Sequence, residues 1–160
     1  MSKPENEYLK LVERYEQLDN GQKAMLRRAT SPDDMAGIAA FYQLISSTKF
    51  QLKQYEKQAA QVVYFLPWIQ QRANGKPLGK SLHEHGISEK RLFLVVRRES
   101  PDDLIQLRRV VQQIKPTAYA DWAELGNLLF YWGKKNKHQL MRDFYISASA
   151  SSQLQEAVEA

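Results

Sequence analysis

Two similar phrases stand about seventy residues apart in the chain, RRATSPDD at Arg27–Asp34 and RRESPDD at Arg97–Asp103. Each follows an apolar stretch with helical spacing and ends in Ser-Pro-Asp-Asp, a sequence typical of the first turn of a helix. The serine oxygen accepts from free backbone N–H groups, proline fits the first helical position, and aspartates favour the positive end of the helix dipole. Each phrase therefore predicts a corner between two helices, with Ser31 and Ser100 as the helix caps.

Apolar side chains recur every three or four residues along nearly the whole chain, which is the spacing of one helix face. Leu92–Val96 is the segment most like a strand, but helix signals bracket it closely. The sequence therefore predicts an all-α fold. Helices are expected over Tyr8–Leu18, up to Arg28, over Ser31–Ile45 with a kink at Gly37, and over Leu52–Leu66, Ser81–His85, Glu89–Arg98, Pro101–Ile114, Asp121–Trp132 and the stretch that carries Leu140–Tyr145.

The segment richest in turn residues is 72–80, which contains an asparagine, a proline and two glycines. We place a boundary there. An N-terminal helical subdomain is expected over 1–72, a linker over 73–80 and a C-terminal helical subdomain over 81–147. Residues 148–160, rich in serine and alanine, are expected to form a mobile tail.

The charge of the chain is unevenly distributed. Of its 23 basic and 18 acidic residues, 20 and 11 respectively lie in 21–146, which gives that stretch a net charge of +9 against +5 for the whole chain. Such an excess favours a polyanionic partner. The absence of cysteine excludes disulfides and thiolate metal sites. With no signal peptide and no apolar run near about 18 residues, we expect a cytoplasmic protein without a membrane partner.

Motifs for catalysis or metal binding are weak. Gly75–Ser81 (GKPLGKS) ends like a phosphate-binding loop, but it has three residues between its glycines where that motif has four, Pro77 removes an N–H donor, and no strand is expected before it. His83 and His85 diverge on a helix by about 200°, and the only other histidine is His138. We therefore expect no enzymatic activity, no cofactor, no metal site and no small-molecule substrate.

Six phrases carry a resemblance to a known family: Gln17–Gly21, Leu26–Arg28, Phe41–Leu44, Gly86–Phe93, Leu107–Arg109 and Tyr131–Lys135. In order and spacing they resemble the CasB family, the small subunit of the type I-E CRISPR Cascade complex, from about Tyr8 to Ile146. The resemblance implies two small helical bundles joined by a short loop, without catalytic activity. It also implies that two copies lie head to tail beside the guide-bearing subunits, where they support the guide RNA–target DNA heteroduplex and the displaced DNA strand. Lys49–Lys80 is the stretch least like the family.

Paired cations at a helix end also complement the helix dipole, so a single arginine pair has an ordinary structural explanation. The clusters together favour phosphate contacts, which suit a protein that must hold any guide and any target. Arg109 points away from the apolar stripe of its helix, Arg108 borders that stripe, and the lysines after Gly133 lie at a helix start, where the dipole opposes cations. Arg28 and Arg98 are also placed to pair with nearby carboxylates. The residues expected to contact nucleic acid are Arg27, Arg28, Arg91, Arg97, Arg98, Arg108, Arg109, Lys134, Lys135 and Lys137.

Two other functions are compatible with the sequence. A stand-alone helix-turn-helix protein would use Leu104–Gln113, which carries Gln106, Arg109, Gln112 and Gln113, as its DNA recognition helix. A protein–protein scaffold would direct the basic clusters to acidic partners. The side chains of Trp68, Trp122 and Trp132 are suited to stacking on unpaired bases, although Trp122 and Trp132 lie in apolar stripes typical of a core.

Overall fold

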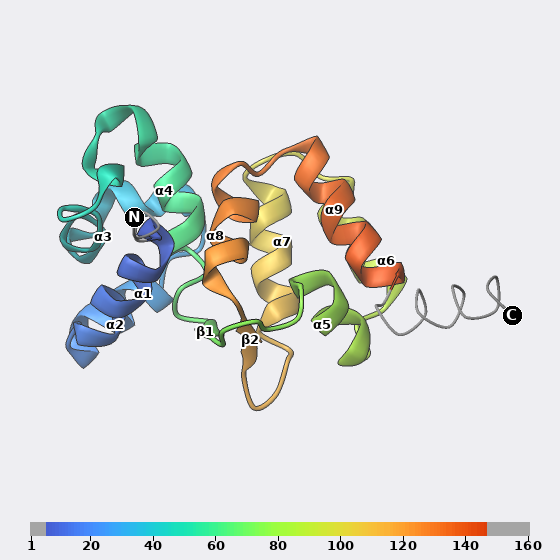
Figure 1. Ribbon diagram of the computed structural model, residues 1–160. Helices are drawn as coiled ribbons and strands as arrows, with labels where there is room; N and C mark the ends of the chain where they lie inside the picture. The colour runs from blue at the N-terminus through green and yellow to red at the C-terminus, as the bar shows by residue number, and fades with distance from the viewer. Residues whose placement is uncertain (1–5, 147–160) are drawn as a thin grey trace, which may run out of the picture.

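Helices form nearly all of the regular structure in residues 6–146, the part of the chain that the computed structural model describes (Figure 1). The all-α prediction is confirmed in this broad form, and Leu92–Val96 lies within a helix as expected. The elements are α1 (Glu7–Gln17), α2 (Asn20–Arg27), the 3-10 helix η1 (Pro32–Gly37), α3 (Ala39–Ile45), the 3-10 turns η2 (Lys49–Gln51) and η3 (Lys53–Tyr55), α4 (Glu56–Val63), β1 (Ile69–Gln71), α5 (Leu78–Glu84), α6 (Glu89–Val96), α7 (Asp102–Val111), β2 (Ala118–Ala120), α8 (Trp122–Phe130) and α9 (Lys134–Tyr145).

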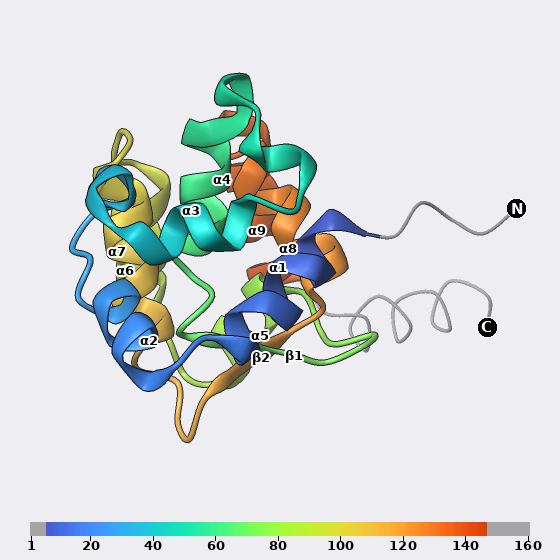
Figure 2. The same cartoon turned by 90° about the vertical axis from the view of Figure 1, so that its left-hand side faces the viewer.

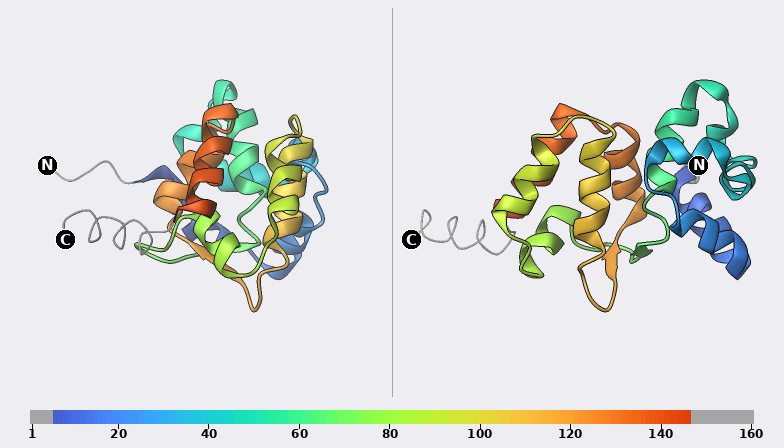
Figure 3. Two further views of the ribbon diagram at one scale, coloured as in Figure 1. Left: turned by 90° about the vertical axis from the view of Figure 1, so that its right-hand side faces the viewer. Right: turned by 180° about the vertical axis from the view of Figure 1, so that it is seen from behind.

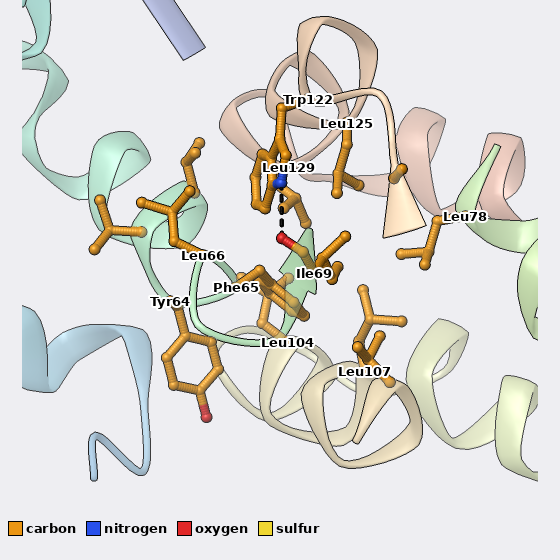
Figure 4. Packing of buried hydrophobic residues seen from close by; sticks show 14 of the residues in the cluster. Tyr64, Phe65, Leu66, Ile69, Leu78, Leu104, Leu107, Trp122, Leu125 and Leu129 are labelled. Carbon is orange, nitrogen blue, oxygen red and sulfur yellow. Dashed lines mark hydrogen bonds between the residues drawn. The ribbon is translucent and has the colours of Figure 1, made fainter. Parts of the chain in front are cut away.

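A small parallel sheet is the one departure from a purely helical fold within residues 6–146. Strands β1 and β2 pair with Ile69 opposite Ala118 and Gln71 opposite Ala120. Two residues after β2, the fully buried Trp122 donates its indole N–H to the Ile69 carbonyl over 2.9 Å (Figure 4). The sequence did not predict these strands, because three residues are too few to show an alternating pattern.

The two corner phrases begin their second helices differently. The Ser31 hydroxyl accepts from the Asp33 N–H at 3.3 Å, and the Asp34 carboxylate accepts from the Ser31 N–H at 3.2 Å, so the predicted cap is confirmed. Ser100 instead donates its hydroxyl to the Asp103 carboxylate at 3.0 Å, and α7 begins without a side-chain cap. The expected Ser100 cap is wrong, because α7 begins at Asp102 and the Ser100 hydroxyl is directed at the buried Asp103 carboxylate instead of at the first free N–H groups.

Helix α8 joins the two halves of the chain. Figure 1 and the right panel of Figure 3 show α7 and α8 between the N-terminal helices α1–α4 and the group α5, α6 and α9. α8 packs against α1 and α4, and Tyr8 of α1 donates its hydroxyl to Asn127 at 3.1 Å. This crossing is close, since a Cβ on Gly126 would overlap the Tyr8 ring. The buried apolar side chains of both halves consequently form one continuous cluster.

The division of the chain into 1–72 and 81–147, with a linker at 73–80, stays a prediction. The tail expected at 148–160 lies outside the described residues.

On the C-terminal side, α9 packs against α5 and α6, and α6 packs against α7. This packing brings the end of α6 beside the start of α9. None of the helices described between residues 6 and 146 has the length and apolar character needed to cross a membrane.

Candidate nucleic-acid interface

The first corner places three arginines near the junction of α2 and α7, which lie on the same side of the molecule in Figure 2. Arg27 ends α2, Arg28 follows it, and both side chains are exposed. Arg109, near the end of α7, is the only exposed residue of that helix. Its charge acts on Tyr64, the ring that Arg108 covers. We call Arg27, Arg28 and Arg109 the first basic group.

Arg108 does not belong to this surface, because only 7% of the residue is exposed. Its guanidinium carbon lies 4.0 Å from the centre of the Tyr64 ring, and Nη2 donates to the carbonyls of Arg27, at 3.4 Å, and Ala29. Burial lowers the pKa of the guanidinium, an effect that the charges of Tyr64 and Asp34 oppose. Arg108 was expected to border the apolar stripe and to contact nucleic acid; in the structure this cation is buried and instead serves carbonyls at and just beyond the end of α2, where the helix offers no partner.

The second corner lies beside the start of α9. Arg97 and Arg98, which follow α6, are exposed, as are Lys134 and Lys135 in the first turn of α9. Arg98 Nη1 is 2.5 Å from Oδ2 of Asp102, but both side chains are nearly half exposed. Such a surface ion pair contributes at most about 1 kcal/mol, so a phosphate can displace it at little cost. We call Arg97, Arg98, Lys134 and Lys135 the second basic group.

Lys137, in contrast, is turned inward. Its Nζ lies 2.7 Å from Oδ2 of Asp103, a residue with no exposed surface, and donates to the Arg98 carbonyl at 2.6 Å. The side chain of the lysine is 14% exposed. The Asp103 carboxylate also accepts from the indole N–H of Trp132 at 2.9 Å. The expectation that Lys137 is a charge placed for a partner is corrected, because this ammonium neutralises a buried carboxylate.

The two corners thus share a construction that goes beyond their similar phrases. In each, a cation from a later helix donates to a backbone carbonyl near the end of the preceding helix: Arg108 to Arg27 and Ala29, and Lys137 to Arg98. The buried cation holds the corner, while the arginines of the phrase itself remain at the surface. Sequence reasoning did not distinguish these two kinds of cation.

The two basic groups are related by the geometry of α7. Asp102, which pairs with Arg98 of the second group, is the first residue of α7, and Arg109 of the first group lies seven residues later. Seven residues make nearly two helical turns, so the two positions share one face of the helix and lie about 10 Å apart along its axis. Arg109 and the partner of Arg98 therefore mark the two ends of one face of α7, and we call this face, with one basic group near each end, the basic stripe.

The remaining candidates lie apart from these groups or in the interior. Arg91 is exposed in the first turn of α6, at the opposite end of that helix from Arg97. Trp122 is fully buried, and Trp132 is half-buried with its indole N–H on Asp103. Trp68 is half-buried, with its ring centre 5.6 Å from the Arg108 guanidinium carbon. The stronger expectation for Trp122, that it belongs to the core, is confirmed.

The structure also bears on the alternatives. Gln106 and Gln112 are half-buried, and Gln113 lies beyond the end of α7, so this helix presents Arg109 rather than a row of side chains for base edges.

A strand, β1, does precede Gly75–Ser81, contrary to expectation. However, Gly79 lies within α5 against the backbone of α9, where it cannot contribute to a phosphate cradle. No group of three or more potential metal ligands is found in the described part of the chain.

Comparison with known proteins agrees with this architecture. Residues 22–145 match the family model of CRISPR-associated protein Cse2. The chain is 29% identical over 153 residues to the CRISPR system Cascade subunit CasB of Escherichia coli strain K12, a match that covers 89% of this chain and 94% of the relative. It superposes with a TM-score of 0.77 on a chain from the crystal structure of E. coli Cascade bound to a PAM-containing dsDNA target. That match has 29% identity and covers 90% of this chain and 98% of the other. With a family model that spans most of its length, the chain belongs to the Cse2 family of CRISPR-associated proteins.

Proposed function

We propose that the chain is a non-catalytic subunit of a type I-E Cascade complex, in which it supports the guide RNA–target DNA heteroduplex and the displaced DNA strand. The contacts are made to phosphate and do not depend on base sequence. Its proposed partners are the guide RNA, the target DNA, other Cascade subunits and a second copy of itself. The support comes from its family and from the Cascade–DNA complex in which the similar E. coli chain is found.

The observation that carries this proposal is the stripe formed by the two basic groups. Seven exposed cations lie at its two ends. The two corners that hold them each contain a buried cation, Arg108 or Lys137, whose hydrogen bonds are made inside the protein. Arginine and lysine at exposed positions bind phosphate oxygens without reading base edges. Arg91 is a separate candidate contact, while Arg108 and Lys137 act by fixing the corners rather than by reaching nucleic acid.

Binding of scrambled duplex DNA over a series of salt concentrations tests the proposal. The parent is expected to bind all sequences alike, with log affinity falling linearly against log salt. Replacing Arg97 and Arg109 together by glutamine should reduce that slope by about two, since each lost phosphate contact removes about one. Arg142→Gln is the matched control, because Arg142 is exposed in the last turn of α9, far along that helix from Lys134 and Lys135.

The same variants, assembled with the other Cascade subunits, give the second readout. Arg97→Gln with Arg109→Gln should still assemble and should bind target DNA more weakly for every guide. A complex that fails to assemble, with an unchanged salt slope for the isolated chain, would assign these arginines to protein contacts. Strong preference for one scrambled duplex over another would overturn the sequence-independent role.

A further inference from the structure

A hollow of about 530 Å³ lies between the loop before α5, the end of α5 and the loop that leads into β2. Figure 1 shows the loop before β2 projecting beyond the sheet, with α5 beside it. The volume lies within the range of sites that hold small ligands, about 300–1,000 Å³. Its cationic side chains are Arg72, Lys76 and Lys115, and its one acidic side chain is Glu84.

Two of these cations have no carboxylate partner. Lys76 Nζ lies 2.7–2.8 Å from the two oxygens of Glu84, so that pair is mutually neutralised. Within residues 6–146, neither Arg72 nor Lys115 makes an ion pair with an acidic side chain, and both are exposed. The hollow therefore presents uncompensated positive charge to any ligand that enters it.

The wall of the hollow also carries a guanidinium placed over an aromatic ring. The Arg72 guanidinium carbon lies 4.0 Å from the centre of the Tyr119 ring. The small sheet holds both groups in place: Tyr119 is the middle residue of β2, and the Arg72 N–H donates to the Ala120 carbonyl at 2.9 Å. A guanidinium plane laid on an aromatic ring offers its outer face for a further flat group, and nucleobases stack on arginine planes in this way.

We propose that this hollow binds an unpaired nucleotide of single-stranded nucleic acid, with the base stacked on the Arg72–Tyr119 pair and the adjacent phosphate on Lys115. Three features favour this ligand: the flat cationic platform of Arg72 on Tyr119, the unpaired positive charge and a volume suited to one nucleotide. An acidic peptide would use the positive charge but has no need of a platform for stacking. The inference deepens the proposed function, because a displaced DNA strand supplies unpaired bases. It adds a contact with bases to the phosphate contacts of the two basic groups.

The test compares two fluorescent probes of equal length and charge, an oligothymidylate and a strand with abasic sites in place of its bases. Stacking gives the parent an expected preference of about tenfold for the oligothymidylate. Arg72→Gln and Tyr119→Leu should each abolish most of that preference, while Lys115→Gln should weaken binding of both probes alike. Lys53→Gln, an exposed lysine of η3 outside the hollow, should change neither property.

Because Tyr119 is half-buried, the binding result for Tyr119→Leu counts only if that variant melts at a temperature near that of the parent. Arg72 is exposed, so Arg72→Gln removes half of the pair without disturbing the core. A parent that binds both probes equally would overturn the inference, and so would an unchanged preference in Arg72→Gln. Either result leaves the proposed function standing if the Arg97 and Arg109 variants still reduce the salt slope. Conversely, a base preference that is lost in the hollow variants, together with an unchanged salt slope in the arginine variants, would support the hollow and overturn the basic stripe.

Discussion

The ammonium of Lys137 lies 2.7 Å from the carboxylate of Asp103, a residue that has no exposed surface. This pair fixes the start of α9 to the start of α7 and thereby positions the second basic group. A buried carboxylate that loses its cation is strongly destabilising, by about 3–5 kcal/mol. The pair is therefore the most sensitive contact that the structure identifies at the second corner.

We expect Lys137→Met to lower the free energy of unfolding by about 3 kcal/mol, because Asp103 is then left buried without its cation. Lys135→Met, an exposed substitution in the same helix, should change it by less than about 0.5 kcal/mol. Urea denaturation monitored by circular dichroism measures both. Equal stabilities of the two variants would show that the ion pair has no structural importance.

The neighbouring arginines of α7 should behave in opposite ways. Arg108→Met leaves the carbonyls of Arg27 and Ala29 without their donor and should reduce stability by about 2–3 kcal/mol. Arg109→Met should leave stability within about 0.5 kcal/mol of the parent and reduce the salt slope of duplex binding by about one. Melting curves and titrations on the same preparations provide the comparison. Loss of stability in the Arg109 variant instead would reverse the roles that we assign.

The Asp34 carboxylate gives the first corner a pH dependence. Hydrogen bonds from the Thr30 backbone N–H and hydroxyl and from the Ser31 N–H hold the pKa of Asp34 below its usual value of 3.8. A pKa that is lower in the folded state stabilises the fold above pH 3.8, and this contribution is lost as the pH falls through the lower folded value.

Asp34→Asn should therefore be less stable than the parent at pH 7, and the difference should narrow as the pH falls below about 4. The matched control is Asp33→Asn, whose carboxylate has no hydrogen bond or ion pair within residues 6–146. Thermal melts of parent and variants across acidic pH values give the measurement. A difference between Asp34→Asn and the parent that stays constant down to pH 2 would contradict the mechanism.

The crossing of α1 and α8 makes a packing prediction. Gly126→Ala places a methyl group into the Tyr8 ring and should reduce stability by about 1–3 kcal/mol. Addition of Tyr8→Leu should recover part of that loss, so the double variant is less destabilised than the sum of the single changes. Gly37→Ala is the control, because a Cβ there meets no atom within 4 Å.

Local features of the fold were predictable from the sequence because their causes are local. Ser31 caps η1 as its phrase indicates, and Asp121, where a helix is expected to begin, caps α8. Arg109 faces solvent because the helical period places it opposite the apolar stripe. In the strands, by contrast, pairing between β1 and β2 depends on residues about fifty positions apart and leaves no local signal.

The candidate site was only partly predictable for the same reason. Arg108 and Arg109 are adjacent in sequence, yet one donates to a carbonyl 79 positions away and the other is exposed. Nothing near Lys137 indicates that the carboxylate of Asp103 lies beside it. The sequence shows which residues carry positive charge, but long-range contacts decide which of these charges are paired inside the protein and which remain exposed. Arg72 and Lys115 were missed because their hollow forms from distant segments.

The position of α8 constrains the order in which the chain can fold during synthesis. α1 and α4 cannot complete the burial of their apolar faces until Trp122–Phe130 is present, and β1 has no partner until Ala118–Ala120 has been made. A ribosome must therefore release the chain as far as residue 130 of 160 before the shared core can close. Until then the N-terminal helices expose the part of their apolar surface that α8 covers in the finished fold, which is the kind of surface that makes an incomplete chain prone to aggregate.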